Sequence, residues 1–195
     1  MAIQLYHLST DPNLSVMVPR VPNNRLVRAG KENGTIPRIC FASSISSALA
    51  AAPPARTGII LYVYSPTSIN RAAVYKPSTQ EVPDSRHTHE VWYLEPTTVK
   101  KIGAIIVGDI IRAKYWGTKE EREGHYDLEW YKYKYLKDPK DKKEIKNYLS
   151  KQPIYNRKLR AKRMERLKGA LGGALTLGAG IAVYNLIGSN LKRVK

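Results

Sequence analysis

The sequence predicts an α+β fold: a small twisted sheet, single or split, with one or two short helices, a basic extension and a long C-terminal helix. Three observations lead to this class. Short apolar runs rich in β-branched and aromatic residues recur between Gly and Pro breaks. A single short helical pattern lies among them, and positive charge gathers after residue 110. We therefore divide the chain into residues 1–110, 111–150 and 151–195.

The first block, residues 1–110, is predicted to be a compact α+β domain. A short helix is expected over residues 43–52, with Ser43 or Ser44 as its N-cap and a Pro-Pro pair as its stop. Residues 17–38 contain three prolines and two glycines, so a long loop without regular structure is expected there. Strands are expected at residues 2–9, 38–43, 57–66, 72–77, 89–96 and 100–111, the last as one strand or two.

The second block, residues 111–150, interleaves tyrosine with lysine and is predicted to be a basic extension. In WYKYKYLK, residues 130–137, a strand would place the three tyrosines on one face and Lys132 and Lys134 on the other. Lysines attract phosphate, and tyrosine rings can stack on single-stranded bases. Equally, the tyrosines can cover a sheet or a neighbouring subunit. A short exposed helix is expected to begin near Pro139.

The third block, residues 151–195, is predicted to be one long helix with a basic half and an apolar half. The basic half, NRKLRAKRMERLK at residues 156–168, is expected to meet the phosphates of nucleic acid or of anionic lipid. The side chains expected to make these contacts are Arg157, Lys158, Arg160, Lys162 and Arg163.

The apolar half of this helix has no charge between Gly169 and Leu191. A helix of that length rises roughly 34 Å, enough to cross a bilayer. Gly169 and Gly173 form a GxxxG pair, and Gly180 continues a small-residue ridge of the kind that lets helices approach closely. The six glycines weaken the stretch as a membrane span, so insertion in a membrane and packing inside a protein assembly both remain open.

Charge and composition show where the basic residues lie and argue against disulfide, metal-binding and secreted classes of protein. Residues 1–110 carry 11 Lys or Arg against 7 Asp or Glu, whereas residues 111–195 carry 22 against 9. The single cysteine excludes an internal disulfide framework. His87 and His89 share a face of a predicted strand but lack a third ligand, so no metal site is predicted. The N-terminus has no basic and then apolar signal, so we expect the protein not to be secreted.

The first block also carries a set of motifs: YHLS at residues 6–9, PRVP at 19–22, RICFASS at 38–44 and HTHEVWYLEP at 87–96. This set is similar to that of small domains encoded by bacteriophages, whose function is unassigned. It also resembles the ADP-ribosyltransferase-like fold, whose members hold NAD over a split sheet.

That resemblance implies an NAD-dependent activity and a set of site residues. Glu90, on a late strand, would be catalytic, because a carboxylate stabilises the oxocarbenium-like centre that departure of nicotinamide leaves. His7 and Tyr6, on the first strand, and Ser43 or Ser44, after the second, would bind the cofactor.

Together these features predict a phage-type accessory protein, located in the virion or the host cytoplasm. Its ADP-ribosyltransferase-like domain would be attached through the C-terminal helix to a membrane or a virion component. The alternative is a non-enzymatic virion structural or DNA-delivery protein whose basic region contacts packaged nucleic acid. In either case we expect assembly with itself or with other chains.

Overall fold

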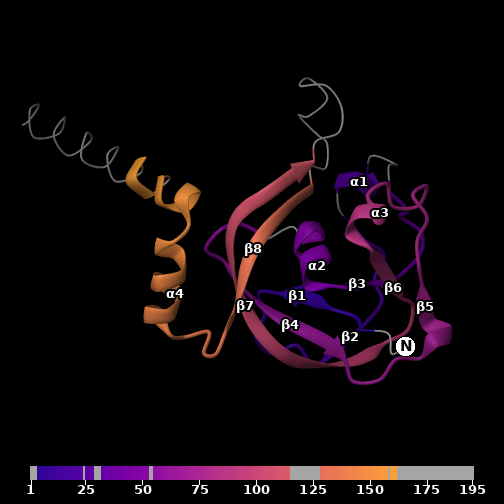
Figure 1. The fold of residues 1–195 in the computed structure, drawn as a ribbon. Coiled ribbons are helices and arrows are strands. Elements are labelled where there is room, and N and C mark those ends of the chain that lie inside the picture. Colours follow the sequence, from indigo (N-terminus) through magenta and orange to yellow (C-terminus); the bar gives the residue numbers. More distant parts are fainter. Residues whose placement is uncertain are drawn as a thin grey trace, which may run out of the picture. The chain divides into compact units, whose positions relative to one another are not determined.

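A computed structural model of the protein describes residues 4–23, 25–28, 32–52, 55–114, 128–157 and 159–161. The chain forms two compact units, Met1–Gln152 and Pro153–Lys195, and each is described by itself. The first unit combines two small antiparallel sheets with a few short helices (Figure 1). The predicted α+β class is therefore confirmed for the described part of the chain.

The larger sheet is organised around one long strand. Seven residues of β4 pair with the first half of this strand, and its second half pairs with β8 to form a long curved hairpin (Figure 1). The strands run in the order β1 (His7–Ser9), β4 (Ile60–Pro66), β7 (Thr97–Lys114) and β2 (Val16–Met17), and β8 (Leu128–Leu136) pairs with β7.

The smaller sheet runs in the order β3 (Ile39–Ala42), β6 (Glu90–Tyr93) and β5 (Val74–Tyr75). A bridge between Tyr6 and Ala42 joins the two sheets, with N···O distances of 2.9 and 3.0 Å. Since Ala42 also lies opposite Glu90, the three residues form one row across neighbouring strands. This row brings the N-terminal strand to the part of the domain that contains Glu90.

The helices are short and mostly begin at polar caps. Helix α2 starts after Ser44, whose side chain accepts a hydrogen bond from the Ser47 amide. Asp141 caps α4 in the same way and accepts from two amides. The prediction that Ser43 or Ser44 caps the first clear helix is thus confirmed for Ser44. The helices are α1 (Arg25–Arg28), α2 (Ile45–Ala51), α3 (Ser85–Thr88) and α4 (Lys142–Ser150), with a 3-10 turn η1 (Arg71–Ala73).

Two apolar clusters lie on opposite faces of the strands. One contains Leu49 of α2 together with Leu61, Val63, Ile105 and Val107 from β4 and β7. The other gathers Leu5, Phe41, Tyr64, Val91 and Tyr93, among other residues. Alternate residues of β4 therefore serve the two clusters, as the pleat of a strand requires.

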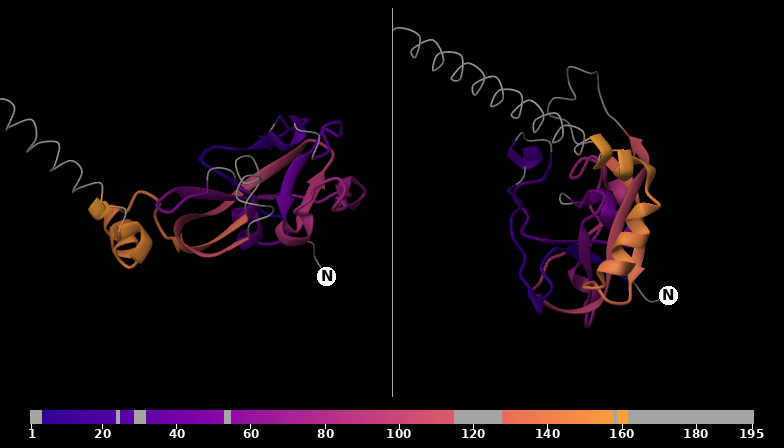
Figure 2. Two further views of the ribbon diagram at one scale, coloured as in Figure 1. Left: turned by 90° about the horizontal axis from the view of Figure 1, so that it is seen from above. Right: turned by 90° about the vertical axis from the view of Figure 1, so that its left-hand side faces the viewer.

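Helix α4 lies against the β7–β8 hairpin on the side away from α2 and runs alongside it (Figures 1 and 2). Tyr131 and Tyr133 of β8 pack on the cluster that includes α2, so these two tyrosines cover the domain core. Lys132 and Lys134 point to the other face and are exposed. The predicted alternation is confirmed, although Tyr135 is 50% exposed.

Several details differ from the sequence-based expectation. Residues 17–38, predicted to lack regular structure, contribute Met17 to β2 and form α1. The segment 100–111 belongs to one strand, β7, which extends to Lys114 and passes through the boundary predicted at residue 110. His87 lies in α3, and His89 ends that helix, so the two histidines do not share a strand face.

The described part of the second unit, residues 153–157 and 159–161, is helical. Among the described residues, none of the helices has the length and hydropathy needed to span a bilayer. The apolar stretch that contains Gly169, Gly173 and Gly180 lies outside the described residues, and so does the predicted long helix from residue 162 onward.

Candidate functional site

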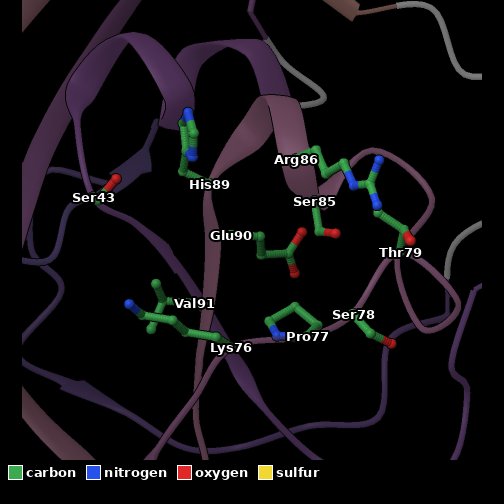
Figure 3. A pocket seen from close by; sticks show the side chains of 10 residues that line it. All are labelled: Ser43, Lys76, Pro77, Ser78, Thr79, Ser85, Arg86, His89, Glu90 and Val91. Atoms are coloured by element: carbon green, nitrogen blue, oxygen red, sulfur yellow. The ribbon is translucent and has the colours of Figure 1, made fainter.

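A pocket of about 480 Å³ lies where β6, α3 and the segment after β5 meet. Its volume falls within the range of small-molecule sites in proteins. In Figure 3 the Glu90 carboxylate points between Ser85 at the start of α3 and Ser78 after β5. The lining residues are Ser43, Lys76, Pro77, Ser78, Thr79, Ser85, Arg86, His89, Glu90 and Val91.

The Glu90 side chain is held by a neighbour on its own strand. The indole Nε1–H of Trp92 donates to Glu90 Oε1 over 2.7 Å. Residues two apart in a strand lie on the same face, so the strand itself sets this contact. Trp92 is fully buried and therefore gives the carboxylate a rigid donor.

Trp92 is fixed in turn by a buried cation. The Arg38 guanidinium lies 4.0 Å from the centroid of the Trp92 ring. Its Nη1 donates to the carbonyls of Asn33 and Ile36 over 2.8 and 3.2 Å, and its Nη2 forms an ion pair with Glu32. A series of side-chain contacts, from Glu32 through Arg38 and Trp92 to Glu90, therefore links the folded loop before β3 to the pocket carboxylate.

Cys40 lies beside this series of contacts, opposite Trp92 in the β3–β6 register. The residue reaches solvent, yet protein atoms crowd its thiol. This burial raises the pKa of the Cys40 thiol, and the Glu90 carboxylate raises it further. The thiol therefore stays protonated at neutral pH, and it is not an activated nucleophile.

A second carboxyl group, Asp84, lies buried next to Ser85 of the pocket lining. Burial raises the pKa of Asp84 to about 7, and the charges of Glu90 and Glu32 add to the effect. Asp84 precedes α3 but makes no side-chain cap hydrogen bond. A proton can therefore be held beside Glu90 near neutral pH.

The rest of the pocket wall supplies cations and hydroxyl groups. In Figure 3 Arg86 reaches towards Thr79, whereas Lys76 lies beside Val91 with its ammonium group directed away from Glu90. Ser78 is oriented by Glu81, to which its amide and hydroxyl donate over 2.8 and 2.9 Å. Two cations, several hydroxyls and one carboxylate suit an anionic ligand that also carries hydroxyl groups.

His89 contributes to the wall from an unusual backbone position. It has φ 48° and is the one non-glycine residue with positive φ in the described part of the chain. The left-handed conformation costs about 1–2 kcal/mol for an L-residue. It turns the chain from α3 into β6 and so places Glu90 directly after the helix.

The predicted site residues divide into two groups. Glu90 and Ser43 line the pocket. Ser44 is absent from that lining, because its hydroxyl caps α2. Tyr6 is also absent, and its hydroxyl donates to Gln4 Oε1 over 2.8 Å.

His7 likewise lies outside the pocket lining. Its Nδ1 is 3.0 Å from the Cys40 carbonyl oxygen, which can only accept, so Nδ1 carries the proton. The ring packs edge-on against Phe41 at 6.0 Å between centroids. Burial lowers the pKa of His7 and keeps the ring neutral at physiological pH. His7 therefore joins β1 to β3.

The residues predicted to bind phosphate differ in their exposure and their partners, and some lie outside the described residues. Lys132 is exposed, whereas Lys134 forms an ion pair with Glu144 at 2.7 Å. Arg157 and Arg160 are exposed in the second unit. Lys158, Lys162 and Arg163 lie outside the described residues.

Sequence reasoning did not find Lys76, Arg86, Arg38 or Asp84 as site residues. Lys76 lies in the irregular segment after β5 and Arg86 in the four-residue helix α3, and neither position carries a signal of its own in the sequence. The stacking of Arg38 on Trp92 depends on the β3–β6 register, which the sequence signals only through the two strand patterns. In the part of the chain that the structure describes, no group of three or more His, Cys, Asp or Glu side chains could hold a metal ion.

Comparison of the chain with protein-family models, with curated proteins and with solved structures finds no match.

Proposed function

We propose that the first unit binds NAD in the pocket at Glu90 and transfers its ADP-ribose group. The observation that carries this proposal is a carboxylate, fixed by a buried indole, at the wall of a pocket that also presents Lys76 and Arg86. The resemblance of the sequence motifs to the ADP-ribosyltransferase-like fold points to the same residue.

The chemistry of the wall suits the substrate. NAD carries two phosphates and two riboses, so it needs cations and hydrogen-bonding groups close together. Lys76 and Arg86 supply charge for the phosphates, and Ser43 and Thr79 supply hydroxyls. Glu90 can accept hydrogen bonds from ribose hydroxyls while Trp92 holds its other side.

Glu90 would act on the bond between ribose C1′ and nicotinamide. When this bond breaks, the electron pair leaves with nicotinamide, and C1′ gains positive charge. A fixed carboxylate stabilises that charge more in the transition state than in the ground state. A hydroxyl or amine of a target, or water, then bonds to C1′ and releases its proton.

Two residues take different roles from those that the resemblance implies. In this proposal His7 and Tyr6 do not touch the substrate, because His7 bonds to the Cys40 carbonyl and Tyr6 to Gln4. Tyr6 instead supports the site through its row with Ala42 and Glu90. Ser43 keeps its implied role.

The test is a Glu90→Gln variant incubated with nicotinamide-labelled NAD. Gln keeps an acceptor for Trp92 but removes the charge, so we expect nicotinamide release to fall by about 10²–10³-fold. Glu95→Gln is the matched control, since Glu95 is an exposed carboxylate whose Oε2 accepts from Asn70. It should keep the wild-type rate. Equal rates for all three proteins, or no turnover by concentrated wild type, would reject the proposal.

A further inference from the structure

A second feature of the molecule, independent of the pocket, is the outer face of α4. Five residues of this helix are exposed. Three of them are cations and two are neutral and polar, so the face carries neither an acid nor an apolar side chain. These residues are Lys142, Lys143, Lys146, Asn147 and Ser150. We call them the α4 basic face.

The opposite side of α4 fixes this face in place. Leu149 is buried, and Ile145 and Tyr148 are half-buried. Gln152, just after the helix, accepts a hydrogen bond from the buried Asp109 amide over 3.0 Å. The lysines therefore stand on a helix whose apolar side and C-terminal end are held by the domain.

The acidic residues around α4 are outnumbered by lysines, six to three between residues 137 and 151, and each acid is oriented by a hydrogen bond or an ion pair. Asp141 accepts from the amides of Lys143 and Glu144 over 2.8 and 3.0 Å as the helix cap. Asp138 accepts from the Lys140 amide over 2.8 Å in the preceding turn. Glu144 forms an ion pair with Lys134. Lys137, Lys140 and Lys151 flank the helix and are exposed as well.

We propose that the α4 basic face binds the phosphate backbone of duplex nucleic acid. A rigid row of cations on a convex helix complements a surface with one negative charge per about 1.7 Å of duplex axis. Lys142 and Lys146 are one turn apart, about 6 Å along the helix, which is close to two nucleotide steps of one strand.

The composition of the face argues for a duplex over two other phosphate-bearing partners. Interfacial helices insert apolar side chains between lipids, and the exposed residues of α4 include none. Proteins that hold single strands stack bases on aromatic rings. The only aromatic residue of α4 is Tyr148, which is half-buried with its hydroxyl oxygen inaccessible to solvent.

The proposal predicts binding that depends on salt and not on base sequence, because backbone contacts carry no sequence information. The test measures fluorescence anisotropy of a labelled DNA duplex with the full-length chain from about 0.05 to 0.2 M NaCl. The variant combines Lys142→Gln, Lys143→Gln and Lys146→Gln. We expect at least about tenfold weaker binding and a log–log salt slope reduced by about three.

The matched control removes the same charge elsewhere, through Arg20→Gln, Arg71→Gln and Lys100→Gln, all exposed positions outside α4. It should weaken binding much less, and the triple Lys→Arg variant of α4 should bind as wild type does. Equal losses in both Gln triples would show that net charge alone attracts the duplex and would overturn the proposal. Tighter binding to a single strand or to anionic vesicles than to the duplex would overturn it too. Thermal melting of each variant verifies that it is folded.

Discussion

Asp84 is a buried carboxyl group whose neighbours make its charge unfavourable. It is 8% exposed, and the negative charges of Glu90 and Glu32 act on it. Its pKa of about 7 means that the folded protein holds a proton at a pH where the unfolded chain has released it. The free energy of unfolding must therefore depend on pH through this residue.

The sign of that dependence follows from the two pKa values. An unfolded Asp has a pKa of about 3.9, so between pH 4 and 7 the folded state binds more protons and stability falls as the pH rises. We expect Asp84→Asn, which has no charge to lose, to remove about 2–4 kcal/mol of this decline between pH 5 and 8. Urea unfolding of both proteins at the two pH values measures it. A parallel pH dependence in wild type and variant would contradict the assignment, and Glu95→Gln serves as the exposed control.

At the same scale, the residues that the resemblance implied as site residues lie in different surroundings. Glu90 and Ser43 line the pocket, and their catalytic and cofactor-binding roles stay predictions. His7 was expected in the site, yet a backbone carbonyl on the next strand captures its ring. Partners that lie across strands depend on register, and the register of short strands is weakly specified by their sequence.

At the scale of elements, the docking of α4 on the β7–β8 hairpin depends on Gly108 of β7. A Cβ atom at this position would overlap the Tyr148 hydroxyl oxygen and would lie 2.9 Å from Gln152 Oε1. It would also lie 3.0 Å from Lys132 Cβ. A glycine in a strand often marks such a close approach of another element.

We expect Gly108→Ala to destabilise the protein by about 1–3 kcal/mol, because the helix must shift to make room. Gly103→Ala is the matched control on the same strand, where an added Cβ would meet Tyr135 at ordinary distances of 3.4 and 3.5 Å. Urea unfolding compares the two, and hydrogen exchange of the α4 amides reports whether the loss is local to that helix. Equal stability of the two variants would show that α4 accommodates the methyl group.

The elements differ in whether nearby residues or distant strand partners define them. The helix after Ser44, the strand in residues 57–66 and α4 were predictable, because caps, prolines and apolar runs define them within a few residues. The 18-residue β7 was harder, since it pairs with three strands and its register shifts once against β4 and twice against β8. Helix α3 was not predicted, and it ends where the chain turns at His89 in the left-handed conformation, directly before the strand predicted at residues 89–96.

At the scale of the whole molecule, the charge and the core are distributed differently. Lys and Arg outnumber Asp and Glu most strongly after residue 110. Among the described residues, however, every buried side chain lies at or before Gln152. Pairing of β8 with β7 places part of the basic half inside the larger sheet. The charge imbalance can be read from the sequence. Which basic residues belong to the folded unit depends on long-range strand pairing, which the sequence does not show.

This distribution predicts how the molecule responds to truncation. If the stability of the first unit comes from its own buried residues, removing residues 153–195 leaves its free energy of unfolding unchanged within about 0.5 kcal/mol. Urea unfolding followed by tryptophan fluorescence compares the full chain with residues 1–152, since all three tryptophans lie before residue 153. A single cooperative transition with the same midpoint is expected for both.

A lower midpoint for the truncated chain would mean that the second unit packs on the first and contributes to its stability. Duplex binding is measured on the same two proteins. If truncation weakens duplex binding while the midpoint of unfolding stays the same, the second unit also contacts phosphate, in addition to α4.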